Sequence, residues 1–242
     1  MKYPALSIII PCYNEEKLVA KCLWHILKQT VLPEEVIFVD NNSTDKSIEI
    51  AEGFIDKFKD VGVEFKILKE EQQGQTFARL NAFSKVKNDL IGSLDTDTLI
   101  SKDWVKTAKE IFSKKENIIA ISGPFYFYNL SIFSKIHFFF VFLMYSIFKP
   151  TYILWGGNVV FKKQIYESIG GLEGCEVMRK ELKLKQPSDD VFLTEKFKLV
   201  GKVKFIWKLK AKGLSRYEKG RTSEETSAFF KVKKYIRKKY KK

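Results

Sequence analysis

Four apolar runs rich in β-branched residues constrain the fold of this chain more than any other feature. They are Ala5–Pro11, Glu35–Asp40, Val63–Leu68 and Asp89–Leu94. Continuous apolar runs of this length are typical of strands that are buried on both faces of a parallel sheet. Each run is followed by a segment with helical periodicity, and this alternation predicts βαβ units in right-handed connection. We therefore expect an α/β fold, Rossmann-related, with a mostly parallel mixed sheet flanked by helices.

Polar residues stand where each predicted strand ends. The sequences Tyr13-Asn14-Glu15, Asp40-Asn41, Gly74-Gln75 and Asp95-Thr96-Asp97 occupy these places, and Lys46–Lys59 is expected to form one helix after the second of them. Parallel strands in such units deliver their carboxyl ends to the same edge of the sheet, where open α/β folds bind ligands. Convergence of these clusters favours a nucleotide site over independent helix caps.

Asp95 and Asp97 follow a buried strand with one residue between them. A hard divalent cation such as Mg²⁺ is commonly held by one or two carboxylates together with phosphate oxygens. The pair therefore indicates a site for Mg²⁺ or Mn²⁺ carried by a phosphorylated substrate. The alternative is that Asp97 or Ser101 only caps the following helix, Lys102–Lys115, as Asp and Ser often do.

Four motifs in order resemble the inverting family 2 nucleotide-sugar glycosyltransferases, which have the GT-A fold. They are Ile8–Glu16, Val39–Asp45, Gly74-x4-Arg79-x-Asn81 and Leu94–Asp97, and the resemblance covers residues 5 to about 200. It implies a metal-dependent enzyme that transfers a sugar from a nucleotide-sugar to an acceptor hydroxyl or phosphate, with inversion at the anomeric carbon.

The resemblance also implies a donor site. Asp97 is expected to bind the metal, and Asp95 to face the ribose or a metal-bound water. Arg79 is expected either to approach the diphosphate or to lie on a solvated helix face. The remaining donor-binding residues implied are Pro11, Tyr13 and Glu15 in the first loop, and Asp40 and Asn41 near the nucleobase and ribose.

The acceptor half of the site is expected after residue 100. Asp189 and Asp190 stand where the family has its catalytic acids, and Asp190 is implied as the base that deprotonates the acceptor. Their alternative role is to cap the helix that follows. The loop near donor sugar and acceptor is implied at Trp155, Gly156, Gly157 and Asn158, with Trp155 either a sugar platform or a core aromatic.

Charge divides the chain unevenly. The formal net charge is +14, and residues 202–242 carry +13 of it, from 16 Lys and Arg against three Glu. We expect a glycosyltransferase domain at 1–201, made of a nucleotide-binding half (1–100) and an acceptor half (101–201), and a basic C-terminal tail at 202–242. Within the tail, Phe229, Val232, Ile236 and Tyr240 recur at helical spacing, which is typical of helices that bind anionic membrane surfaces.

These features predict a cytoplasmic protein held at the inner face of the cell membrane, with no signal peptide and no spanning helix. Expected partners are a nucleotide-sugar donor and a lipid-linked or saccharide acceptor, and no nucleic acid. The apolar segment Ile136–Phe148 is a core helix, a dimer contact or a membrane-interface segment. Two other functions are considered. One is a nucleotidyltransferase, although the first loop lacks the glycines and basic residues usual there; the other is a nucleic-acid-binding protein that uses the basic tail.

Overall fold

The computed structural model describes residues 3–115, 117–128, 133, 136, 139, 140, 143, 154, 156–185, 188–214 and 222–240, with the backbone alone for 222–227. Trp155 and most of the segment Ile136–Phe148 lie outside the described residues, so the predictions made for them are not tested.

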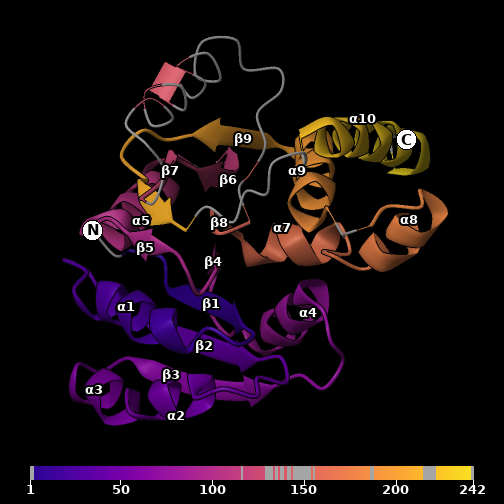
Figure 1. Ribbon diagram of the computed structural model, residues 1–242. Coiled ribbons are helices and arrows are strands. Elements are labelled where there is room, and N and C mark those ends of the chain that lie inside the picture. Colours follow the sequence, from indigo (N-terminus) through magenta and orange to yellow (C-terminus); the bar gives the residue numbers. More distant parts are fainter. Residues whose placement is uncertain are drawn as a thin grey trace.

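The N-terminal half is a parallel βα arrangement, drawn in indigo and purple in Figure 1. Its strands pair in the order β3-β2-β1-β4, all parallel. The four predicted strands are confirmed to within one residue at each end. The elements are β1 (Leu6–Cys12), α1 (Glu16–Leu27), β2 (Glu35–Asp40), α2 (Ser47–Glu52), α3 (Ile55–Asp60), β3 (Glu64–Lys69), α4 (Gln75–Lys85) and β4 (Leu90–Leu94).

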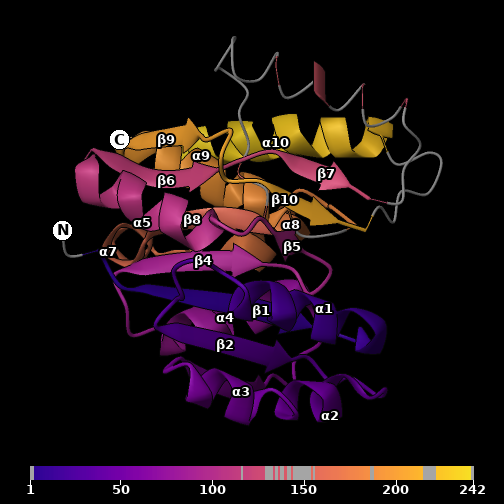
Figure 2. The ribbon, with the colours of Figure 1, turned by 90° about the vertical axis from the view of Figure 1, so that its left-hand side faces the viewer.

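The C-terminal half extends the same sheet. Next to β4 come β8, β6 and β9, giving the seven-stranded order β3-β2-β1-β4-β8-β6-β9, which Figure 2 shows from β2 near the bottom to β9 near the top. Strand β8 is antiparallel to both neighbours, so the expected mostly parallel mixed sheet is confirmed. The elements are α5 (Trp104–Lys114), β6 (Ile118–Ser122), β8 (Asn158–Lys162), α7 (Lys163–Ser168), α8 (Cys175–Glu181), α9 (Asp189–Val200), β9 (Lys202–Phe205) and α10 (Thr222–Tyr240).

A second, small sheet stands beside the carboxyl end of β4. It pairs β5 (Leu99–Ile100), β10 (Ala211–Gly213) and β7 (Phe125–Phe127) in that order. Because β5 follows the Asp95–Asp97 turn directly, this sheet holds one end of that turn in place.

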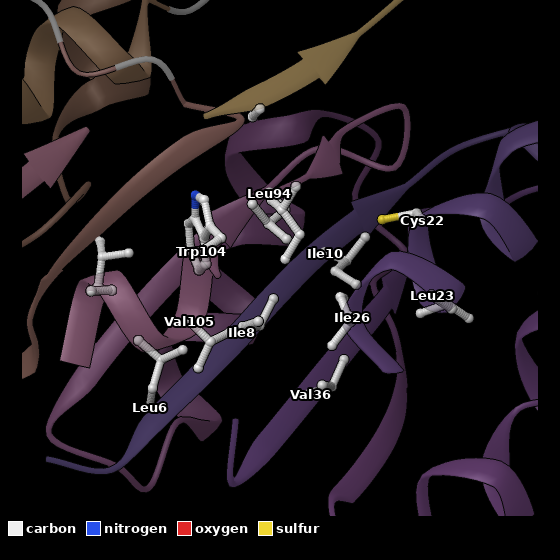
Figure 3. Packing of buried hydrophobic residues seen from close by; sticks show 14 of the residues in the cluster. Leu6, Ile8, Ile10, Cys22, Leu23, Ile26, Val36, Leu94, Trp104 and Val105 are labelled. Carbon is white, nitrogen blue, oxygen red and sulfur yellow. The ribbon is translucent and has the colours of Figure 1, made fainter. Parts of the chain in front are cut away.

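Each face of the large sheet carries its own hydrophobic cluster. Ile8 and Ile10 of β1 point to one face, where Figure 3 shows them among Ile26 of α1 and Val105 of α5. Ile9 points to the other face, which α4, α7, α9 and α10 cover. This two-sided burial is the physical reason why the strand sequence is apolar throughout rather than alternating.

The structure corrects two expectations about the elements. The expected helix Lys46–Lys59 is two short helices, α2 and α3, separated at Gly53 and Phe54. The expected boundary at residue 201 is also wrong, because β9 is an edge strand of the large sheet and β10 is the central strand of the small one. Residues 202–213 therefore belong to the α/β fold itself and not to a separate tail.

The apolar stripe of the C-terminal helix is used inside the protein. Val232 and Ile236 of α10 are fully buried in the cluster that also contains Phe192 of α9, and α9 and α10 lie side by side in Figure 1. In this fold the stripe is therefore covered by the protein itself. Among the described residues, no helix is both long enough and apolar enough to cross a bilayer.

Candidate active site

A cavity of about 540 Å³ opens where β1, β2 and β4 end. The carboxyl edge of parallel strands is where open α/β folds bind ligands. The polar loops that were expected to converge therefore do meet. Predicted site residues that line the cavity are Pro11, Tyr13, Glu15, Asn41, Arg79, Asp95, Asp97, Gly156, Gly157, Asp189 and Asp190.

The turn that carries Asp95 and Asp97 is tied to the first loop. The buried hydroxyl of Thr96 donates a hydrogen bond to the backbone oxygen of Pro11 at 2.7 Å. With Thr96 directed into the protein, both acidic side chains line the cavity. A Cβ atom at Gly213 would lie 3.7 Å from Oδ1 of Asp97, so strand β10 comes close to this carboxylate.

The alternative role of Asp97 or Ser101 as a helix cap is not seen. Helix α5 begins at Trp104, and its N-cap residue is Asp103, whose side chain makes no capping hydrogen bond. The pair Asp95 and Asp97 is thus placed by the strand and the turn, and the requirements of the next helix do not explain it.

Arg79 joins the two acidic clusters. Its Nη2 lies 2.6 Å from Oδ1 of Asp95, and its Nη1 lies 2.5 Å from Oδ2 of Asp189. Only 4% of Arg79 is exposed, so the expectation of a solvated helix face is wrong. Burial by itself lowers the pKa of Arg79, but the charges of Asp189 and Asp95 outweigh it and raise the pKa above its usual value.

Gly156 and Gly157 lie against this ion pair. A Cβ atom on Gly156 would stand 2.9 Å from both terminal nitrogens of Arg79, and one on Gly157 would stand 2.6 Å from Oδ2 of Asp95. A glycine next to a strand often marks a place where the backbone approaches another group closely, and that is the case here. The groups approached are the side chains of Arg79 and Asp95.

Asp190 stands at the first turn of α9 and faces the cavity. Its Oδ1 accepts the N–H of Val191 at 2.7 Å, and its own N–H donates to Oδ1 of Asp189 at 2.9 Å. Burial, followed by the negative charge of Asp189, raises the pKa of Asp190 to about 7, against the lowering effects of the Val191 N–H and Arg79. A carboxylate with this pKa is a stronger base than an ordinary aspartate.

Asp40 and Asn41, at the end of β2, were both expected near the nucleobase and ribose, but only Asn41 lines the cavity. Asp40 is 1% exposed and does not line the cavity; its carboxylate accepts the N–H of Ser43 and shapes the turn. Asn41 does line the cavity, while its side chain bonds the backbone of Glu70, Gln72 and Gly74. The side chain of Asn41 thus fixes the loop before α4.

Asn158 is structural. It is fully buried, accepts a hydrogen bond from Nε1 of Trp104 at 2.7 Å, and donates to the backbone oxygens of Gly123, Pro124 and Leu209. It does not line the cavity. Its side chain joins α5, β8 and the segment before β10, while Gly156 and Gly157 of the same loop do line the cavity.

Several residues that line the cavity belong to no motif recognised in the sequence. Gln75 donates to Oδ1 of Asp95 at 2.8 Å, and its position directly after the motif glycine Gly74 was the only available signal. Phe125, Phe127 and Leu214 reach the cavity from the small sheet and the residue after it. Their pairing through β10 links segments far apart in the chain, which no local pattern indicates.

The donor set suits a hard divalent cation. Asp95 and Asp97 bring carboxylate oxygens to one cavity, and Mg²⁺ and Mn²⁺ favour oxygen ligands. In the described part of the chain, no group of three His, Cys, Asp or Glu residues could hold an ion. A cation would therefore need further ligands such as phosphate oxygens and water, which is the usual arrangement for Mg²⁺ with phosphorylated substrates.

Comparison with solved structures agrees with this geometry. A mannosyltransferase, PcManGT from Pyrobaculum calidifontis, solved in complex with GDP-Man and Mn²⁺, superposes with a TM-score of 0.73 over 98% of this chain and 65% of that chain, at 18% identity. At that identity the likeness shows the fold, which is the GT-A fold of glycosyltransferases.

Sequence relatives point the same way. Glycosyltransferase GlyG of Streptococcus pneumoniae is 31% identical over 132 residues, covering 51% of this chain and 43% of the relative. An uncharacterized glycosyltransferase of Haemophilus influenzae is 35% identical over 131 residues, covering 54% and 50%. The chain thus matches half or less of the length of these relatives. The model of glycosyl transferase family 2 matches residues 7–170, more than half of the chain and every strand that delivers the donor-side loops. The chain belongs to glycosyl transferase family 2.

Proposed function

We propose that the protein is an inverting glycosyltransferase that moves a sugar from a nucleoside-diphosphate sugar to an acceptor hydroxyl. One observation carries the proposal. The paired carboxylates Asp95 and Asp97, and the separate acid Asp190, line the same cavity at the carboxyl edge of the sheet. Membership of the family and the GDP-Man complex of PcManGT support a nucleotide-sugar as the donor.

Asp190 has the position and the basicity for the proton transfer. Its carboxylate takes the acceptor hydroxyl proton while the acceptor oxygen attacks the anomeric carbon. The anomeric bond to the diphosphate breaks as the new bond forms, and the nucleoside diphosphate leaves with the bonding electrons. A single displacement of this kind inverts the anomeric configuration. Burial and Asp189 raise the pKa of Asp190 to about 7, which gives the base the strength to accept the proton.

The donor side has to hold a diphosphate. Tyr13 lines the cavity with half of its side chain exposed, where a nucleobase can pack on the ring. Asp97, with Asp95, would hold a Mg²⁺ or Mn²⁺ ion, which when bound supplies Lewis-acid stabilisation of the departing diphosphate. As the family resemblance implies, we assign the principal metal contact to Asp97, with Asp95, which also contacts Arg79 and Gln75, beside it.

The test is release of nucleoside diphosphate from a panel of nucleotide-sugars with Mg²⁺ or Mn²⁺, with the anomeric configuration of the product read by NMR. Asp190→Asn should lower turnover by about 10³-fold, since a general base typically contributes that much. The matched control is Asp60→Asn, an exposed carboxylate at the end of α3. Full turnover in Asp190→Asn would place the base elsewhere. Retained anomeric configuration would overturn the single displacement.

We also propose that the acceptor is lipid-linked and met at an anionic membrane. The support comes from the outward face of α10, where Lys231, Lys234, Arg237 and Lys238 are exposed and Phe230 is 61% exposed. A juxtamembrane Lys or Arg near an anionic surface contributes roughly 1 kcal/mol of attraction. Since the apolar stripe of α10 is buried, charge would dominate this contact.

Cosedimentation with vesicles that contain anionic lipid tests the membrane contact. Binding should weaken as salt rises, and should be lost in Lys234→Glu/Lys238→Glu. The control pair is Lys57→Glu/Lys59→Glu on α3, where both lysines are also exposed, at the other end of the molecule (Figure 1). Equal loss of binding in both pairs would show a response to net charge alone and would remove α10 as the docking face.

A further inference from the structure

The side chain of Arg79 contacts both acidic clusters of the cavity. It comes from α4 and reaches Asp95 at the end of β4 and Asp189 at the start of α9, residues that lie 16 and 110 positions away in sequence. A guanidinium presents its N–H groups in a rigid fork, so two carboxylates bound to its two terminal nitrogens are fixed relative to each other. Arg79 therefore binds both the turn that carries Asp95 and the first turn of α9, the helix of the proposed base.

The contact continues from Arg79 to the base. Asp189 uses Oδ2 for Arg79 and Oδ1 for the N–H of Asp190. Asp189 is 7% exposed, so its two oxygens are occupied by these partners inside the protein. The position of the first turn of α9, and with it the direction of the Asp190 carboxylate, depends on where Arg79 holds Asp189.

The backbone next to Arg79 keeps the guanidinium in place. Gly156 covers it so closely that any side chain would meet both terminal nitrogens at 2.9 Å. On the same side, Gly157 closes over Asp95. This cover leaves no room for a side chain beside the guanidinium, whose orientation is set by its contacts with the two carboxylates. Such support is what a positioned site requires.

We infer that Arg79 is a positioning residue, which aligns Asp190 through Asp189 and holds this alignment in register with the donor-binding carboxylate Asp95. The inference rests on the proposed function for the role of Asp190. It also makes Asp189 a positioning residue, because Asp189 acts through Arg79 and the Asp190 backbone, in place of the catalytic role expected from the sequence.

Two substitutions separate the two arms of the contact. Lysine at 79 keeps the charge but, with a single ammonium group, cannot reproduce the planar fork. Asparagine at 189 keeps the shape, but its amide has one oxygen, so it can accept from Arg79 or from the Asp190 N–H and cannot serve both as a carboxylate does. Asp189→Asn should therefore affect only the base, whereas Arg79→Lys should affect both the base and the donor side.

The kinetic test uses Arg79→Lys, Asp189→Asn and the double variant. The matched control is Arg179→Lys, in the half-buried ion pair with Glu176 on α8. Misplacement of a catalytic group by about 1 Å costs about 10²-fold in rate. In Asp189→Asn, kcat should fall by about 10²-fold while the donor KM stays unchanged. In Arg79→Lys, kcat should fall by the same factor and the donor KM should rise. The double variant should have the kcat of Arg79→Lys alone. The inference would be overturned if the loss of kcat in the double variant equalled the product of the two single losses. It would also be overturned if Arg179→Lys lost kcat to a similar extent.

A second measurement does not depend on activity. Amide hydrogen exchange by NMR reports the protection of the Asp190 N–H, which should fall about tenfold in Arg79→Lys, while the N–H of Leu18 in the first turn of α1 stays unchanged. Unchanged protection at Asp190 would overturn the positioning role even in an active enzyme. Failure of Asp190→Asn to reduce turnover would instead overturn the proposed function and leave the exchange result standing.

Discussion

The backbone of Gly157 packs directly on the carboxylate of Asp95. A Cβ atom at 157 would stand 2.6 Å from Oδ2 of Asp95 and 3.1 Å from Oγ1 of Thr98. The loop that enters β8 and the turn that leaves β4 therefore fit together only because residue 157 has no side chain. The shape of the donor side of the cavity depends on this contact.

Gly157→Ala should disturb donor binding more than chemistry. The added methyl forces Asp95 or the loop to move, and overpacking of this kind costs about 1–3 kcal/mol of stability. We expect a higher donor KM and a lower Tm. The control is Gly53→Ala after α2, where a Cβ has its nearest neighbour at 3.4 Å. A wild-type donor KM in Gly157→Ala would show that the loop yields without cost to the site.

Asn158→Ala should lower the free energy of unfolding without a specific effect on catalysis. The substitution leaves Nε1 of Trp104 and the backbone oxygen of Leu209 buried without this partner. Unpaired buried polar groups cost about 1–3 kcal/mol each. Chemical denaturation should show the loss, while kcat measured well below the new Tm stays near wild type. A normal Tm with a large loss of kcat would return Asn158 to the reacting centre.

The activity should rise with pH through about 7. The base must be deprotonated to accept a proton, and the pKa of Asp190 is raised to about 7 by burial and by Asp189. The other groups facing it are Arg79, Asp95 and the thiol of Cys175, whose pKa burial raises so that it stays neutral. In a profile of kcat/KM, Asp189→Asn should move the acid limb to lower pH, because it removes a neighbouring negative charge. An acid limb at the ordinary aspartate pKa of about 4 would contradict this assignment.

The same pKa shift makes a prediction for stability. A carboxyl group whose folded-state pKa is raised stabilises the folded state fully below its unfolded pKa, and this contribution is lost as pH rises through the folded pKa. For Asp190 the window runs from about pH 4 to about pH 7. The Tm of Asp190→Asn relative to that of wild type should therefore rise as the pH increases from 4 to 8. A constant difference across that range would show that Asp190 has no such shift.

The two faces of α10 should respond differently to substitution. Ile236 is fully buried against the second cluster, so Ile236→Ala should cost about 2–5 kcal/mol. Lys238 on the outward face should tolerate alanine within about 0.5 kcal/mol. Denaturant titration of the full chain measures both. Equal stabilities would mean that α10 does not pack on α9 in solution.

Local patterns predicted the strands and the location of the donor-side loops. Ile8, Ile9 and Ile10 indicated burial on both faces, and parallel pairing then required the polar loops to meet at one edge. Asp190 was placed correctly at the start of a helix that faces the cavity. These features depend on residues that are close in sequence or on the general rule for parallel strands.

Long-range partnerships could not be predicted in the same way. Arg79 stands three and four residues before Ala82 and Phe83, a spacing that puts it on the buried face of α4, but nothing nearby identifies Asp189 as its partner. The C-terminal segment was predicted to be a separate tail because its high positive charge outweighed the strand pattern within it. In β9, Val203 alternates with Lys202 and Lys204, which is the pattern of an edge strand with one face on the core.

A thermal-shift titration of the full chain with nucleoside diphosphates, with and without Mn²⁺, tests the division of roles between Asp97 and Asp190 most directly. At a ligand concentration of about 100 Kd, binding adds about 2.7 kcal/mol of stability, enough for a shift of several degrees. We expect metal-dependent stabilisation by at least one nucleoside diphosphate in wild type and in Asp190→Asn, and its loss in Asp97→Ala. Stabilisation by no nucleoside diphosphate, or stabilisation that survives in Asp97→Ala and disappears in Asp190→Asn, would contradict the proposed site.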